Sequence, residues 1–280
     1  MERYFASQLE DDVRKLFKMS QVVVGVGLGM SAHAQQSESL SPQNELSIGA
    51  YYSRGDYGQT LDTSIYYLPV SYKRSFGNWN VQASVPYLEI SGAGNVLVNV
   101  GGVGREELEV LDNPAASSNN RGVGDSVLSA TYQMPAFSSA APFIDLGFEV
   151  KVPTANKDKG LGTGAYDYGL QVDAYQQLGQ TTLFATLGYK IRGKSDLFSQ
   201  MTDSGFVSLG FTRPLNERFS AGVIYDFREA ASSTSGETHE VLPYISWAIA
   251  NEWTLMSYIV KGFTQDSADI AVGMQLNYRW

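Results

Sequence analysis

The sequence predicts an all-β protein: a closed antiparallel transmembrane β-barrel of about 12 strands, with both termini in the periplasm. Three observations support this prediction. Apolar and polar residues alternate along many short segments, tight and long connections alternate between those segments, and the composition is poor in charge. Charged residues make up 18% of the 280 residues and aromatic residues 12%, whereas an average soluble domain has roughly 25% charged residues.

Alternation with a period of two indicates strands with one lipid face and one inward face. The C-terminal segment DIAVGMQLNYRW alternates over its whole length, and its apolar face consists of Ile270, Val272, Met274, Leu276, Tyr278 and Trp280. The pattern is weak in 63–75, 122–133 and 252–263, where the facing stays open. The expected strands are 45–53, 63–75, 79–90, 122–133, 142–153, 166–177, 181–192, 204–213, 217–228, 239–249, 252–263 and 268–280.

The connections between these segments alternate in length. Tight turns are expected at 76–79, 177–181, 213–217 and 249–252, with a somewhat longer one at 134–142. Longer loops are expected at 54–62, 91–121, 154–165, 193–203 and 229–238. Outer-membrane barrels have short periplasmic turns and longer external loops, so this pattern places both termini in the periplasm. Because an unpaired strand edge is unfavourable in hydrocarbon, we expect the last strand to pair with the first.

Both ends of the chain carry export or insertion features. Basic residues precede the apolar stretch VVVGVGLGM, and Ala32-His33-Ala34 fits the small-x-small rule for signal peptidase. We therefore expect 1–34 to be a cleaved signal peptide, 35–44 a short periplasmic segment and 45–280 the barrel. A buried first strand and a translation start at Met19 are the alternatives. Tyr278 and Trp280 should lie at the periplasmic interface, where aromatic rings favour the headgroup level, and form a C-terminal insertion signal.

Charge and cysteine content exclude several partners. The net charge is −9, which argues against nucleic acid, because proteins that bind it present a basic face. With 0 Cys, the chain has no disulfide framework and no thiolate metal site. We expect no cofactor and no metal. The expected location is the outer membrane of a Gram-negative bacterium, with its lipid and the barrel-assembly machinery as partners.

Charged residues of both signs fall on the inward faces of the expected strands. The pore-lining candidates are Lys73, Asp125, Asp145, Glu149, Lys151, Asp173, Lys190, Arg192, Asp226, Arg228 and Arg279, and Glu45, Asp167 and Asp269 share their facing. An opposed acidic and basic lining would orient dipolar solutes in a pore. The alternative is that these charges pair across the lumen and hold the barrel rigid. A barrel of this size can hold a narrow pore or be largely plugged.

The longest loop, 91–121, is the expected gate. Its apolar residues Val96, Leu97, Val98 and Val100 would be costly to leave in water as a patch. We expect them to fold into the barrel mouth and narrow it, or to bind apolar solutes on entry. A hairpin that extends the strands above the membrane is the alternative.

Four stretches carry short motifs: SVPYLEIS (84–91), RGVGDSVLSATYQ (121–133), EVKVPTANKDKGLGTGAYDYGLQVDAYQQLG (149–179) and LFATLGYKIRG (183–193). They resemble the MetA-pathway of phenol degradation family of transporter-like outer-membrane proteins. Gly122-Val123-Gly124-Asp125 fits that family's Gly-x-Gly-Asp motif, and Leu161-Gly162-Thr163-Gly164 fits its Leu-Gly-Thr-Gly loop. Pro153-Thr154 departs from it, because Ala155 stands in place of glycine. The resemblance spans residues 45–280 and implies a barrel that passes small, often aromatic compounds.

The function favoured by these features is passive uptake of small, aromatic or apolar compounds through a channel that is not an enzyme. A structural or adhesive surface barrel is one alternative. A barrel hydrolase is another, and His239, beside Glu237 and Glu240, is its candidate residue. The segment lacks the His-x-Ser arrangement expected of a twelve-stranded phospholipase, whose chemistry needs a serine beside the histidine.

Overall fold

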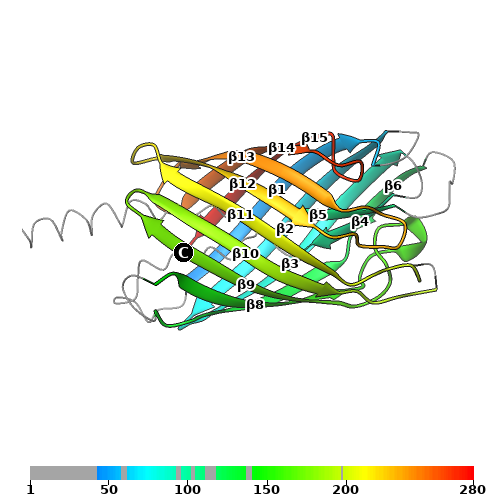
Figure 1. Cartoon of the computed structure of the whole chain (residues 1–280), viewed down its shortest axis with the longest axis horizontal. Helices are drawn as coiled ribbons and strands as arrows, with labels where there is room; N and C mark the ends of the chain where they lie inside the picture. Colours follow the sequence, from blue (N-terminus) through cyan, green and yellow to red (C-terminus); the bar gives the residue numbers. More distant parts are fainter. Residues whose placement is uncertain are drawn as a thin grey trace, which may run out of the picture.

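The computed structural model describes residues 43–57, 62–92, 96–101, 105–110, 118–136, 141–196 and 198–280, and most of these form a closed antiparallel β-barrel (Figure 1). The wall strands are β1 (Gln43–Gly55), β2 (Thr63–Phe76), β3 (Trp79–Gly92), β6 (Ser118–Val123), β7 (Ser126–Gln133), β8 (Phe143–Val152), β9 (Asp167–Leu178), β10 (Thr181–Ile191), β11 (Ser204–Pro214), β12 (Phe219–Arg228), β13 (Thr238–Ala248), β14 (Trp253–Gly262) and β15 (Ile270–Arg279). β6 and β7 both pair with β3 and together fill one position, which confirms a barrel of twelve wall positions.

Two smaller elements stand apart from the wall. β4 (Val96–Gly101) and β5 (Arg105–Val110) pair with each other as a separate two-stranded sheet. The 3₁₀-helix η1 (Lys157–Lys159) lies in the connection between β8 and β9. No helix in the described part of the chain is long and apolar enough to cross a membrane.

The first and last strands close the barrel, as predicted. β1 pairs with β15 on one side and with β2 on the other. At this seam the Asn44 N–H donates to the Trp280 carbonyl at 2.9 Å, and the Trp280 N–H donates to the Asn44 carbonyl at 3.1 Å. These bonds extend β1 to Gln43, slightly before the expected start at 45. The predicted signal peptide, 1–34, lies outside the described residues.

Connection lengths alternate around the barrel. One end, here the short-turn end, carries the connections 77–78, 134–142, 179–180, 215–218 and 249–252 together with Asn44 and Trp280. The opposite, long-loop end carries 56–62, 93–117, 153–166, 192–203, 229–237 and 263–269. The two-residue hairpins begin with Gly77 (φ 54°) and Gly179 (φ 60°), because such turns need a positive φ that glycine adopts without strain. Which end faces the periplasm stays a prediction.

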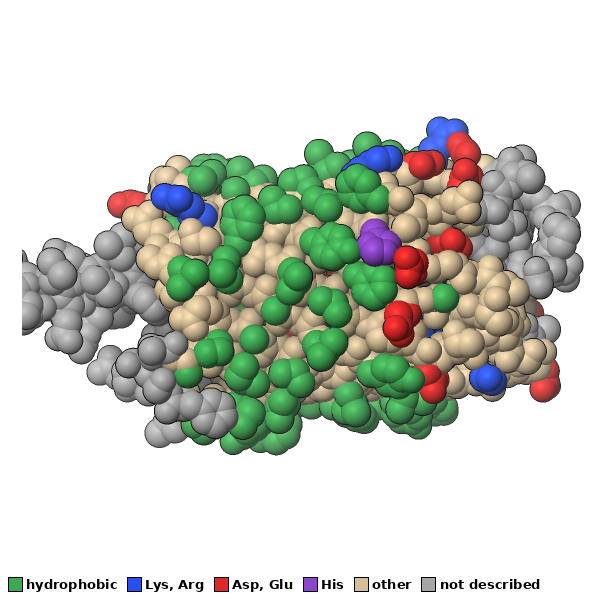
Figure 2. All heavy atoms as spheres, viewed as in Figure 1, with side chains coloured by type: hydrophobic (Ala, Val, Ile, Leu, Met, Phe, Trp, Pro, Cys, Tyr) green, Lys and Arg blue, Asp and Glu red, His purple; other side chains and the backbone are tan. Residues whose placement is uncertain are grey.

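The outer surface of the wall is apolar. Exposed outward side chains include Ile48, Leu68, Val85, Leu128, Leu146, Leu170, Leu187, Leu209, Ile245, Ile259, Val272 and Met274. Figure 2 shows hydrophobic side chains spread over the wall, with charged side chains gathered toward the two ends of the barrel. Soluble monomers rarely expose apolar patches above a few hundred Å², so this belt is a lipid-facing surface.

Aromatic side chains form a girdle at the short-turn end. All four tryptophans, Trp79, Trp247, Trp253 and Trp280, lie there. Trp79 packs on Tyr132 with ring centroids 4.9 Å apart, and Phe219 stacks on Trp247 at 5.9 Å. Tyr278 links Trp253 (4.6 Å) to Trp280 (5.4 Å). Such girdles mark a membrane interface, which agrees with the interfacial position predicted for the two C-terminal aromatics.

Candidate functional site

The interior of the barrel is the candidate site, and all eleven predicted pore-lining residues are on its inward face. Asp125, Asp145, Lys151, Asp173, Lys190, Arg192, Asp226 and Arg228 are buried, and Lys73, Glu149 and Arg279 are partly exposed. Glu45 and Asp167 are also buried. Asp269, by contrast, is exposed. The alternating pattern runs into it, but β15 begins only at Ile270, so Asp269 belongs to the loop and the inward prediction for it is wrong. Conduction past the other residues stays a prediction.

One charge cluster lies across the β1–β15 seam at the short-turn end. Glu45 stands opposite Arg279 on one side and Lys73 on the other. Its carboxylate binds the Lys73 ammonium at 2.8 Å and also accepts a hydrogen bond from the Arg279 guanidinium. A buried carboxylate needs such partners, because taking it out of water costs several kcal/mol. The cluster therefore ties the two closing strands to their neighbour.

Two further ion pairs lie toward the long-loop end of the barrel. Lys190 on β10 reaches Glu149 on β8 at 3.6 Å across the intervening strand β9. The residue between them in register is Gly169, which has no side chain to separate the pair. Within β12, Arg228 binds Asp226 at 2.8 Å, and the Asp226 carboxylate also accepts from a serine hydroxyl of β11. That such pairs hold the barrel rigid stays a prediction.

Two carboxylates, Asp145 and Asp173, face each other on β8 and β9. Both are fully buried. Asp173 accepts from the Thr186 hydroxyl at 2.6 Å and from the Gln171 amide at 2.8 Å. Within the described residues no group of three or more His, Asp or Glu side chains could hold a metal ion.

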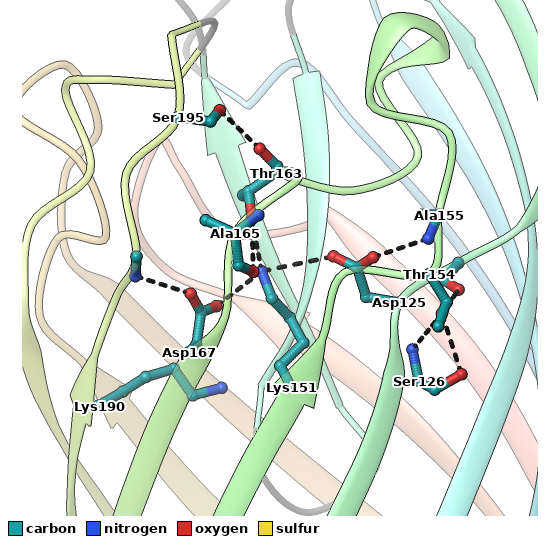
Figure 3. A network of polar contacts seen from close by, with 12 residues as sticks. Asp125, Ser126, Lys151, Thr154, Ala155, Thr163, Ala165, Asp167, Lys190 and Ser195 are labelled. Atoms are coloured by element: carbon teal, nitrogen blue, oxygen red, sulfur yellow. Dashed lines mark hydrogen bonds and ion pairs between the residues drawn. The ribbon is translucent and has the colours of Figure 1, made fainter.

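The most connected cluster lies at the long-loop end (Figure 3). The Lys151 ammonium, 1% exposed, binds Asp167 at 2.7 Å and Asp125 at 3.5 Å and donates to the Thr163 hydroxyl at 2.7 Å. Asp125 lies at the break between β6 and β7 and also accepts from the Ala155 N–H at 2.9 Å. This cluster brings together the Gly-x-Gly-Asp and Leu-Gly-Thr-Gly motifs, which are far apart in the sequence.

A continuous apolar row also lines the interior, and sequence reasoning missed it. In register across β8 to β13, the inward residues are Phe143, Tyr175, Phe184, Gly210, Ile224 and Leu242. Apart from Gly210, they belong to, or pack against, one buried cluster that also includes Tyr244 and Met256. Large aromatic residues at inward positions of otherwise polar faces were the signal that could have found it.

Several inward aromatic rings lie flat over glycines of the next strand. A Cβ added at Gly188 would lie 2.1 Å from the Phe206 ring, and one at Gly210 would lie 2.4 Å from the Phe184 ring. Tyr258 covers Gly273 in the same way, at 2.3 Å. Because these glycines have no side chain, the rings can lie against the wall. A side chain at the same positions would push the rings into the lumen.

Polar inward side chains that remain partly open to solvent lie in the short-turn halves of β2, β3 and β7 and in the middle of β9. They are Ser71, Ser75, Gln82, Ser84, Ser129, Thr131, Gln133 and Gln171, with Lys73 among them. The long-loop halves of β2, β3 and β7 are instead apolar on the inside, at Ile65, Leu88 and Val127. The interior therefore combines zones of hydroxyls and amides with zones of aromatic and aliphatic side chains.

The predicted gate is a hairpin whose side chains are not described. Its backbone pairs Val96 with Val110 and Gly101 with Arg105. Figure 1 draws the β4–β5 hairpin toward the long-loop end of the barrel. The side chains of Val96, Leu97, Val98 and Val100 lie outside the described part, so their gating role stays a prediction.

His239 lies on the outer surface of the barrel. Its ring nitrogens contact the Tyr225 hydroxyl at 2.7 Å and the Glu237 carboxylate at 3.2 Å, and its ring packs on Phe227. These contacts anchor the histidine beside an aromatic patch and supply no serine to its ring.

Comparisons with known proteins agree with this architecture. A crystal structure of the COG4313 outer membrane channel from Pseudomonas putida F1 superposes with a TM-score of 0.65 at 11% identity, covering 87% of this chain and 97% of that one. A NanC porin structure superposes with a TM-score of 0.50 at 10% identity, covering 83% and 97%. These likenesses show the fold. A comparison with curated proteins gives no match. The model of the family described as "Putative MetA-pathway of phenol degradation" matches residues 47–280, and the chain therefore belongs to this family of outer-membrane barrels.

Proposed function

We propose that the protein is a passive outer-membrane channel for small compounds that combine an aromatic or apolar part with a polar group. The observation that carries this proposal is the mixed interior. Half-exposed side chains such as Gln82, Ser129 and Thr131 offer hydrogen bonds in one zone, and the row through Tyr175 and Phe184 forms an apolar zone of the wall. Pockets that take small ligands combine these two kinds of lining. The family description, which refers to phenol degradation, supports the same class of solute.

The proposed setting follows from the surface of the barrel. The apolar belt would contact outer-membrane lipid, the short-turn end would face the periplasm, and the barrel-assembly machinery would insert the chain. Such a channel performs no chemistry. The contacts of His239 with Tyr225 and Glu237 support this, because a serine hydrolase needs a serine hydroxyl at the imidazole.

Single-channel recording on the refolded mature protein in a planar bilayer tests the proposal. We expect steady ion-conducting steps. Benzyl alcohol should interrupt the current more than myo-inositol does, because inositol has hydroxyls but no apolar face. A folded barrel that conducts no ions would refute the channel. It would favour the second candidate, a structural barrel, which is supported by the ion pairs that bridge neighbouring strands, such as Glu45 with Lys73.

A further inference from the structure

We propose that the connection between β8 and β9, residues 153–166, is a fixed inner loop that narrows the long-loop end of the lumen. In this proposal the tip of the loop, which packs on the wall through Leu161 and Thr163, limits solute size, and Lys151 is the residue that positions it. The inference rests on the proposed channel function. It assigns the constriction to a different segment from the β4–β5 hairpin.

The tip of the inner loop lies inside the barrel. Leu161 is 2% exposed and Thr163 is 0% exposed, although both belong to a connection between strands. Leu161 shares one buried cluster with Leu88, Ile90 and Val127, which are inward residues of β3 and β7. Because the outer faces of these strands are exposed, a residue packed against their inward side chains must lie in the lumen.

Close approach of the backbone fixes the tip against the wall. A Cβ added at Gly162 would lie 2.5 Å from the Asp125 carboxylate, and one at Gly122 would lie 2.9 Å from the Leu161 side chain. The loop turns at Gly160 (φ 64°) and Gly164 (φ 73°), conformations that glycine adopts without strain. Both glycine motifs therefore take part in the same contact, in which the loop tip packs on the wall at the break between β6 and β7.

Polar contacts hold the tip from both sides. On one side Lys151 donates to the Thr163 hydroxyl at 2.7 Å while it pairs with Asp167 and Asp125. On the other side the Ser195 hydroxyl donates to the Thr163 carbonyl at 2.7 Å. Figure 3 shows Thr163 between Lys151 and Ser195, so the inner loop is attached both to β8 and to the connection that follows β10.

Lys151 is the critical element of this attachment because of the charge balance. It is a single buried cation between the two buried carboxylates of Asp125 and Asp167. Without it, two negative groups would remain close together in a poorly solvated site, which is strongly unfavourable. Outward movement of the inner loop would admit water to these groups. Removal of the cation should therefore loosen the loop.

The test compares Lys151→Met with Lys73→Met in the complete refolded protein. Each lysine pairs with a buried carboxylate of the lumen, but Lys73 lies on β2 at the short-turn end, away from the inner loop. The Lys73→Met variant reports what loss of one lumen cation does to flux. A milder variant, Thr163→Val, removes the hydroxyl that accepts from Lys151 and keeps all the charges. Folding is checked by heat-modifiable migration.

Two readouts are needed: amide hydrogen exchange of 160–165 and swelling of liposomes in arabinose and in sucrose. We expect exchange in 160–165 to become about tenfold faster in Lys151→Met and to change less in Thr163→Val. Exchange there should match the parent in Lys73→Met. We also expect Lys151→Met to raise the sucrose-to-arabinose ratio of swelling rates. Leu161→Ala should raise the same ratio without faster exchange in the inner loop.

The outcomes separate this inference from the channel function. Unchanged exchange in Lys151→Met, or equal loosening in Lys73→Met, would overturn the positioning role. A loosened loop with an unchanged sucrose-to-arabinose ratio would overturn the constriction. A parent protein that passes neither ions nor arabinose, together with a Lys151→Met variant that passes both, would contradict an open channel but support the inner loop as its closure.

Discussion

Replacement of Gly188 by alanine tests how the aromatic rings fit against the barrel wall. The new Cβ would lie 2.1 Å from the Phe206 ring, whereas carbon atoms rest at about 3.5 Å or more. The ring must therefore shift by about 1.4 Å, and the direction left open is into the lumen. Overpacking of this kind typically costs about 1–3 kcal/mol. We expect that loss in the free energy of unfolding, together with a lower single-channel conductance.

Urea unfolding of the refolded barrel in detergent micelles measures the cost, and a double-mutant cycle with Phe206→Ala isolates its cause. The loss due to Gly188→Ala should largely disappear when the ring is absent. Gly205→Ala is the control, because the atom nearest to its Cβ would be a Glu229 carboxylate oxygen at 3.3 Å, the end of a flexible side chain. The reasoning fails if Gly205→Ala costs as much as Gly188→Ala, or if the loss persists without the Phe206 ring.

Three further predictions concern the seam, the terminus and the hairpin. Glu45→Gln leaves two cations without their carboxylate and should lower the urea midpoint clearly. Asp62→Asn, which breaks an exposed pair with Arg54, should cost less than about 1 kcal/mol. Equal losses would contradict the buried seam. Trp280→Ala should reduce the fraction of heat-modifiable barrel assembled in cells more than Trp247→Ala does. Both tryptophans belong to the girdle, but only Trp280 belongs to the predicted insertion signal. Deletion of 95–112 should raise single-channel conductance, and unchanged conductance would contradict a gate in that segment.

The twelve strands could be predicted from sequence because lipid outside and a mixed interior impose the same period on every strand. The pattern was weak in β2, β7 and β14 for a physical reason that the structure makes clear. Their inward positions include Ile65, Tyr67, Val127, Met256 and Val260, all in the buried apolar cluster. Where both faces of a strand are apolar, alternation disappears, so the weak strands marked apolar zones of the lumen.

The inner loop could not be predicted in the same way. Local sequence identified 154–165 as one of several long loops, and its glycines as a family motif. That Gly162 packs on Asp125 depends on which strands are neighbours around the closed barrel, since β8 and its loop meet β7 and β6 only through wall pairing. The inward facing predicted for Asp269 was wrong for the opposite reason. Here the local alternating pattern extends beyond the end of the strand, β15.

The partners of the lumen charges are also a matter of register. Lys151 stands opposite Asp167, Glu45 opposite both Lys73 and Arg279, and the Lys190–Glu149 pair spans a glycine in one continuous row. In a poorly solvated interior each cation must have a carboxylate nearby, so these charges contribute local dipoles to the wall and little net field. Between these charges, the lumen presents zones of hydroxyls and amides and zones of aromatic rings. Selection among small compounds by such a lumen would depend on shape and apolar contact more than on charge.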